Sequence, residues 1–114
     1  MPPPILISAA SSVRQRATVS PVVIEHCRKH DLNELLELAI DIAAHNFILA
    51  APIDVELEVD FDSDEQRPIL NIPVAATVEE TRNQYHAFMQ EWVDRVSADS
   101  QLKIGFCPNI VESG

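Results

Sequence analysis

The sequence predicts a small α+β domain in which a three-stranded, mostly antiparallel sheet carries two to three helices on one face. Two patterns support this fold class. Residues 53–62 alternate apolar and acidic side chains without a break, as the residues of a half-buried strand do. Residues 32–49 and 77–96 repeat apolar side chains mostly at steps of three and four, the spacing of an amphipathic helix. The expected order is helix, helix, strand, strand, helix, strand.

Length and composition fit one domain. The chain has 114 residues, of which 46% are hydrophobic, and this is enough for a single core. Residues 1–19 contain three prolines and no hydrophobic periodicity, so we expect an irregular N-terminal arm there. Residues 20–114 then form the single α+β domain. The first residues lack the basic segment of a signal peptide and the length of a membrane span, which favours a soluble cytoplasmic protein.

A short helix is expected at the start of the domain. Ser20 can cap a helix, and Pro21 suits the first helical position because its missing N–H has no partner there in any case. The helix should run from Pro21 to about Lys29. Its inner side is expected to carry Val23, Ile24 and Cys27.

The second helix is the most apolar element. Asp31 and Glu34 have the spacing of a capping box, and apolar residues then recur at helical spacing over about residues 32–49. Pro52 ends this helix, because the residue before a proline is pushed out of the helical region.

An antiparallel hairpin follows. Its first strand, residues 53–62, turns alternate residues to a core face that carries Ile53, Val55, Leu57, Val59 and Phe61. Residues 63–67 make a connection of hairpin length. The second strand, residues 68–74, has a proline near each end, so we expect it to be short and partly at an edge of the sheet.

The last helix and strand complete the sheet. Thr77 and Glu80 form a capping box, and the helix should reach about Val96. We expect its apolar stripe to pack in the core, since a helix needs tertiary packing to be stable. The stripe comprises Val78, Tyr85, Phe88, Met89, Trp92, Val93 and Val96. Leu102, Ile104 and Phe106 alternate with other residues and predict a third strand, parallel to the second after a right-handed crossover.

The charge of the chain gathers on the first strand of the hairpin. Eight bases face 18 acids, a net charge of −10, and seven of the acids lie between positions 54 and 65. We call the carboxylates on the outer face of this strand the acidic row: Asp54, Glu56, Glu58, Asp60 and Asp62. Such a row repels nucleic acid and favours a basic protein partner. The alternative interpretation is a solvated strand face whose charge resists edge pairing.

A weak divalent metal site is conceivable at the end of this strand. Asp60, Asp62 and Asp64 match the first three ligand positions of a calcium loop. The glycine and the glutamate that such a loop needs later are replaced by Glu65 and Asn71. His26 and His30 can share a helix face, but two ligands are too few for a structural zinc site.

No catalytic centre or cofactor site is predicted. The chain has two glycines, which excludes a glycine-rich phosphate loop. The one candidate for nucleophilic catalysis is the Cys107 thiol with His45 or His86 as its general base. Nothing in the sequence brings these residues together. Cys27 and Cys107 are expected to be buried free thiols.

The leading functional hypothesis is therefore a small acidic protein-binding module without enzymatic activity. Its acidic row would dock on a basic partner, as an antitoxin, immunity protein or comparable inhibitor could dock on a basic active site. The alternatives are a structural homo-oligomeric assembly subunit, such as a homodimer, and a small enzyme that depends on a divalent metal at Asp60, Asp62 and Asp64.

Overall fold

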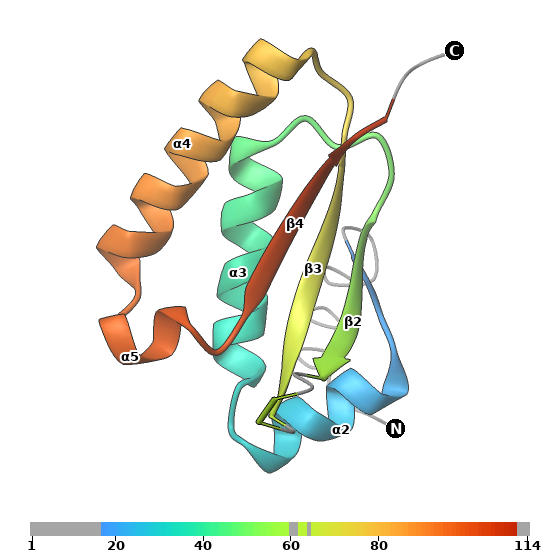
Figure 1. Ribbon diagram of the computed structural model, residues 1–114, viewed down its shortest axis with the longest axis vertical. Coiled ribbons are helices and arrows are strands. Elements are labelled where there is room, and N and C mark those ends of the chain that lie inside the picture. The colour runs from blue at the N-terminus through green and yellow to red at the C-terminus, as the bar shows by residue number, and fades with distance from the viewer. Residues whose placement is uncertain (1–16, 60–61, 64, 112–114) are drawn as a thin grey trace, which may run out of the picture.

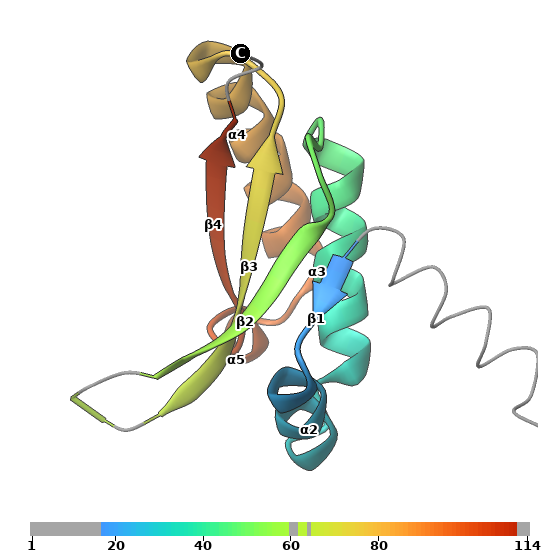
Figure 2. The same cartoon turned by 90° about the vertical axis from the view of Figure 1, so that its right-hand side faces the viewer.

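A mixed four-stranded sheet forms one layer of the protein, and helices cover one of its faces (Figure 1). This computed structural model describes residues 17–59, 62–63 and 65–111. Its elements are, in chain order, β1 (Ala17–Val19), α2 (Pro21–Lys29), α3 (Asn33–Asn46), β2 (Ile53–Val59), β3 (Gln66–Val74), α4 (Val78–Arg95), α5 (Ala98–Gln101) and β4 (Gly105–Ile110). The strands lie in the order β1-β2-β3-β4, and Figure 2 looks onto the face that the helices leave open. The predicted α+β class is confirmed.

The predicted three-stranded, mostly antiparallel sheet is wrong in two respects. Residues Ala17–Val19, which the sequence assigned to the N-terminal arm, form a fourth strand that pairs in parallel with β2. Only β2 and β3 pair antiparallel, since β3 and β4 are also parallel, as expected for that pair. Three residues are too few to show a strand pattern in the sequence, so β1 is recognisable only by its pairing with β2. Residues 1–16 lie outside the described part of the chain.

The prediction that residues 68–74 form a short strand partly at an edge is also wrong. β3 is nine residues long and lies between β2 and β4. The carbonyl of Pro73 accepts from Ala50 on the β2 side, whereas that of Val74 accepts from Val111 on the β4 side. Because N–H and C=O of one strand residue point the same way, the nitrogen of Pro73 faces β2 and that of Pro68 faces β4.

The two ladders along β3 explain why both prolines are tolerated. Pairing with β2 extends only to Asn71, so the nitrogen of Pro73 faces a point beyond the end of that ladder. Pairing with β4 begins at Ile69, so the nitrogen of Pro68 faces a point before the other ladder starts. Neither proline removes a donor that the sheet needs, which is the condition for proline inside a strand.

The predicted starts of α2 and α4 are confirmed, but that of α3 is not. The N-cap of α3 is Leu32 and not Asp31, no side chain caps it, and the helix ends at Asn46, well before Pro52. α2 has the expected bounds, although Ile24 is exposed and only Val23 and Cys27 are buried. At the start of α4, the hydroxyl of Thr77 accepts from the Glu80 amide at 3.1 Å, and the Glu80 carboxylate accepts from the Thr77 amide at 3.1 Å. A fourth helix, α5, was not predicted, and it moves the start of the last strand from position 102 to Gly105.

Aromatic rings hold α4 against β4. The ring of Phe106 on β4 meets Phe88 and Trp92 of α4 edge-on, with centroids 4.6 and 4.9 Å apart. Phe47, at the end of α3, packs on Phe88 at 5.4 Å. Phe88 and Trp92 are almost completely buried, so the core lies between the sheet and the α3–α4 layer.

Only part of the predicted core stripe of α4 is in the core. Phe88, Trp92 and Val96 are buried, whereas Val78, Tyr85 and Val93 are exposed. The stripe is wider than the contact that one helix makes with a sheet, so its outer residues reach past the covered area.

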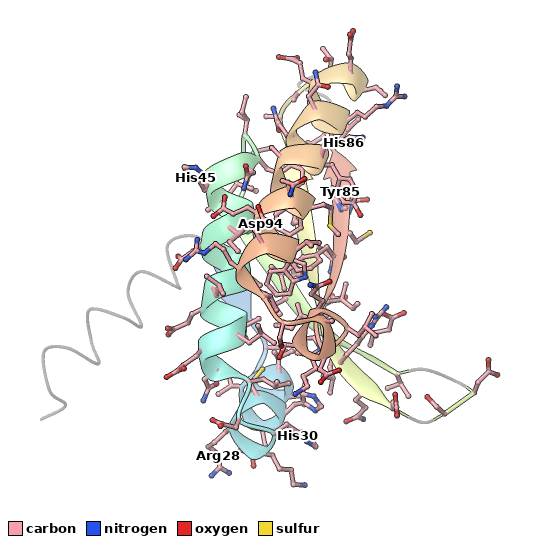
Figure 3. All side chains as sticks on the ribbon, turned by 90° about the vertical axis from the view of Figure 1, so that its left-hand side faces the viewer. Arg28, His30, His45, Tyr85, His86 and Asp94 are labelled. Carbon is pink, nitrogen blue, oxygen red and sulfur yellow. The ribbon has the colours of Figure 1, made fainter. Side chains whose placement is uncertain are left out.

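The apolar face of β2 also leaves the core along its length. Ile53 and Val55 are fully buried, Leu57 is half-buried and Val59 is 44% exposed. The end of the hairpin that carries Val59 extends away from α3 and α4 (Figures 2 and 3). Phe61 lies outside the described residues.

Candidate partner-binding surface

The described members of the acidic row lie on the open face of the sheet. Asp54, Glu56 and Glu58 are exposed on β2 and alternate with side chains that point toward the helices. In an extended strand, next-but-one residues stand about 7 Å apart on the same face. Asp62 is exposed in the turn after the strand, and Asp60 lies outside the described residues. Asp54, Glu56 and Glu58 thus present carboxylates at regular spacing to solvent.

Cross-strand neighbours on β3 partly offset these charges. Arg67 lies opposite Glu58, with its Nε 3.6 Å from the Glu58 carboxylate, and both side chains are about half exposed. An ion pair this exposed contributes less than about 1 kcal/mol to stability. The Asn71 amide donates to Glu56 at 3.5 Å. Within the described residues, no cation forms an ion pair with Asp54 or Glu56. Asp54 and Glu56 therefore keep their negative charge.

Beside the acidic row, the open face carries both apolar and polar side chains. Ile69 and Pro73 of β3 are half-buried there, and Cys107 of β4 is exposed. A Cβ at Gly105 would collide with Cδ1 of Ile69 and lie 3.3 Å from the Arg67 guanidinium carbon. A glycine at this position of β4 thus lets both side chains lie flat on the sheet. The face thus carries the carboxylates of β2 beside the mixed apolar and polar side chains of β3.

An open groove of about 1150 Å³ lies at the projecting end of the hairpin. The hairpin, the end of α2 and the turn before β4 line it with His26, His30, Leu32, Glu58, Val59, Asp62, Glu65, Gln66, Arg67, Leu102 and Lys103. The sequence did not predict this groove, because its walls come from positions up to 77 residues apart that only the fold brings together. Its lining mixes carboxylates and cations, so its charge favours no single class of ligand.

The two groove histidines lie against each other. The ring centroids of His26 and His30 are 4.5 Å apart, one turn from each other on α2. Burial lowers the pKa of His26, and the nearby His30 and Lys29 lower it further. Among the described residues, no group of three histidine, cysteine, aspartate or glutamate side chains converges as a metal would require. Asp60 and Asp64 lie outside those residues, so the weak metal site at Asp60, Asp62 and Asp64 stays a prediction.

The structure separates the residues considered for nucleophilic catalysis. Cys107 is on the open face of β4, whereas His45 belongs to α3 and His86 to α4 on the other side of the sheet. The prediction of a buried thiol is confirmed for Cys27, whose pKa is raised by burial, and is wrong for Cys107.

Comparisons with known proteins give no family. No protein-family model, curated protein or solved structure matches the chain. None of the helices in the described ranges has both the length and the apolar character of a membrane span.

Proposed function

We propose that the protein is a small acidic protein-binding module whose acidic row docks on a basic surface of a partner protein. One observation carries this proposal. Asp54, Glu56 and Glu58 are exposed in one row on the sheet face that the described helices leave open, in a chain with a net charge of −10.

The electrostatics of the open face favour such a partner. The field of a carboxylate row steers a positively charged surface toward it and speeds association at low ionic strength. Ile69 and Pro73, with Asn71 between them, lie on the neighbouring strand and can exclude water once the partner has docked. Charge would govern the approach, and apolar contact would slow dissociation.

The need for a basic surface narrows the classes of protein that could be the partner. Proteins that act on nucleic acids expose basic sites, and carboxylates at strand spacing can occupy such a site in place of phosphates. We therefore propose a neutralising role of the antitoxin, immunity or inhibitor kind, with a basic enzyme or nucleic-acid-binding protein as the target.

Charge reversal tests this proposal against a matched control. The double variant Glu56→Lys/Glu58→Lys should lose a basic partner captured by the wild-type protein at low salt, and that partner should also dissociate at high salt. Glu34→Lys/Glu37→Lys changes the net charge equally on α3, on the opposite layer, and should retain the partner. The measurement is affinity capture with mass spectrometry, followed by titration of the identified partner.

Two results would contradict the proposal. One is a partner that both double variants retain with the wild-type affinity. The other is equal loss in both variants, because net charge and not the acidic row would then be responsible. Circular dichroism of each variant checks folding, which exposed substitutions should leave nearly unchanged.

A further inference from the structure

A second apolar stripe runs along α4 outside the core. The buried stripe of this helix contains Thr81, Phe88 and Trp92. The second stripe comprises Val78, Tyr85, Met89 and Val93, at steps of seven, four and four residues. Met89 is half-buried, and the other three are exposed. Such spacing keeps all four on one side of the helix, where a solvated helix would carry polar residues.

Contacts with α3 show which side of α4 this stripe occupies. The amide of Asn46 donates to Glu91 at 3.1 Å, and Gln84 accepts from the Ile48 amide at 3.2 Å. At 100° per residue, Tyr85 and Met89 are rotated from Phe88 in the direction opposite to Gln84 and Glu91. Figure 3 agrees, since Tyr85 lies on the side of α4 that faces away from α3. The stripe therefore borders β4, on which Phe88 and Trp92 pack.

β4 continues this apolar surface at the edge of the sheet. It is an end strand, and Pro108 and Ile110 turn to the helix side, half-buried and 40% exposed respectively. We call Val78, Tyr85, Met89, Val93, Pro108 and Ile110 the α4–β4 flank. Val111 donates to Val74 of β3, so the nitrogen of Pro108, three residues earlier, faces the free edge. Because that nitrogen has no hydrogen, the edge is a poor template for a continuous ladder, and contact must come from side chains.

The lack of carboxylates on the α4–β4 flank indicates what kind of molecule can bind there. On the stripe side of α4, the series 78, 82, 85, 89 and 93 contains a single charged residue, Arg82, and no carboxylate. A basic partner is drawn to the acidic row and not to this surface. Two copies of a chain with a net charge of −10 meet least repulsion where their carboxylates are absent.

We propose that the α4–β4 flank binds a second copy of this chain, about a two-fold axis. A two-fold contact joins the same patch on both copies, so an apolar stripe meets an apolar stripe and each Val93 loses its water contact. α4 has 18 residues and spans about 27 Å, which is long enough for a pair of helices to pack over several turns. The acidic rows stay free, so this association is independent of the function proposed above.

A single valine substitution and a matched control test the dimer. Val93→Glu inserts a carboxylate into the flank, whereas Val22→Glu makes the same change on α2 at a residue that is 61% exposed, compared with 48% for Val93. Sedimentation or light scattering over a range of concentrations gives the dissociation constant. We expect a dimer for the wild-type protein and for Val22→Glu, and at least a tenfold weaker dimer for Val93→Glu. High salt should leave the wild-type dimer intact because the contact is apolar.

Three results would overturn the dimer: a wild-type protein that is monomeric at every concentration, a Val93→Glu dimer as tight as the wild type, or equal weakening by both substitutions. Thermal unfolding shows whether each variant is folded, and Ile110→Glu provides a second test of the flank from the β4 side. If the dimer proposal is wrong, the acidic row should still capture a basic partner. The experiments therefore test the two proposals independently.

Discussion

The two ends of β2 have the same alternating pattern but differ in how deeply their apolar side chains are buried. At the start of the strand, Ile53 and Val55 are fully buried under the helix layer. At its end, Val59 has the same parity and is 44% exposed. Alternation therefore assigns a side chain to a face, but burial requires another layer opposite that face.

The carboxylates of the hairpin occur along both parts of β2. Seven acids lie between positions 54 and 65. Asp54 lies between the buried Ile53 and Val55, whereas Glu58 precedes the exposed Val59. Charged side chains at a projecting hairpin keep their hydration, so they cost little in stability.

The largest expected effect comes from the covered region. Trp92→Ala should reduce the free energy of unfolding by about 3–5 kcal/mol. The buried indole packs edge-on against Phe106, and its removal leaves a cavity. Urea unfolding measures this loss. A loss below about 1 kcal/mol would contradict the placement of Trp92 in the core, since exposed substitutions have effects of that size.

A pair of substitutions on β2 tests the comparison itself. Ile53→Ala should cost about 2–5 kcal/mol, the range for a buried large-to-small change. Val59→Ala, six residues along the same face, should cost less than about 1 kcal/mol because Val59 is already half in water. Equal losses in urea unfolding would mean that the far end of the hairpin is covered in solution.

A smaller effect is expected at the exposed start of α4, in the helix layer. Thr77→Ala removes the hydroxyl that accepts from Glu80 and should cost about 1 kcal/mol. Ser97→Ala is the matched control, because Ser97 caps the short α5 without a side-chain hydrogen bond. Its loss should be clearly smaller, and the same loss at both positions would argue against the capping box.

The smallest effect is a dependence on pH at the same cap. The pKa of Glu80 lies below the ordinary value of 4.5 because its carboxylate accepts from the Thr77 amide. A lowered pKa means that the charged carboxylate stabilises the fold above pH 4.5, and that this contribution fades as the pH falls through the lowered value. Thermal unfolding should show the wild-type protein more stable than Glu80→Gln at neutral pH, with the gap closing in acid. A gap that is the same at both pH values would contradict this.

Features set by neighbours in the chain were predictable. The start of α2 follows from Pro21 at the first helical position, and the start of α4 follows from the reciprocal bonds of Thr77 and Glu80. The outward direction of Asp54, Glu56 and Glu58 follows from the period of a strand. These signals are local, because a cap or a pleat involves residues that are at most a few positions apart.

Features set by distant pairing were not predictable. β1 is a strand because residues 17–19 pair with β2. Arg67 lies opposite Glu58 because of the register in which β2 and β3 pair. The proximity of Ile69 to Gly105, and the groove between α2 and the hairpin, likewise join remote parts of the chain. The sequence of a short strand has too little pattern to predict which strand it pairs with.

By itself, the sequence determined where α2 and α4 begin, which face of β2 is acidic, and how much negative charge the chain carries. Tertiary structure decided which apolar residues are core and which are surface. Val55 and Val59 on β2, and Phe88 and Tyr85 on α4, show the difference within single elements. The physical reason is that hydrophobic burial depends on area removed from water, and this area is fixed by what packs opposite each residue and not by its neighbours in the chain.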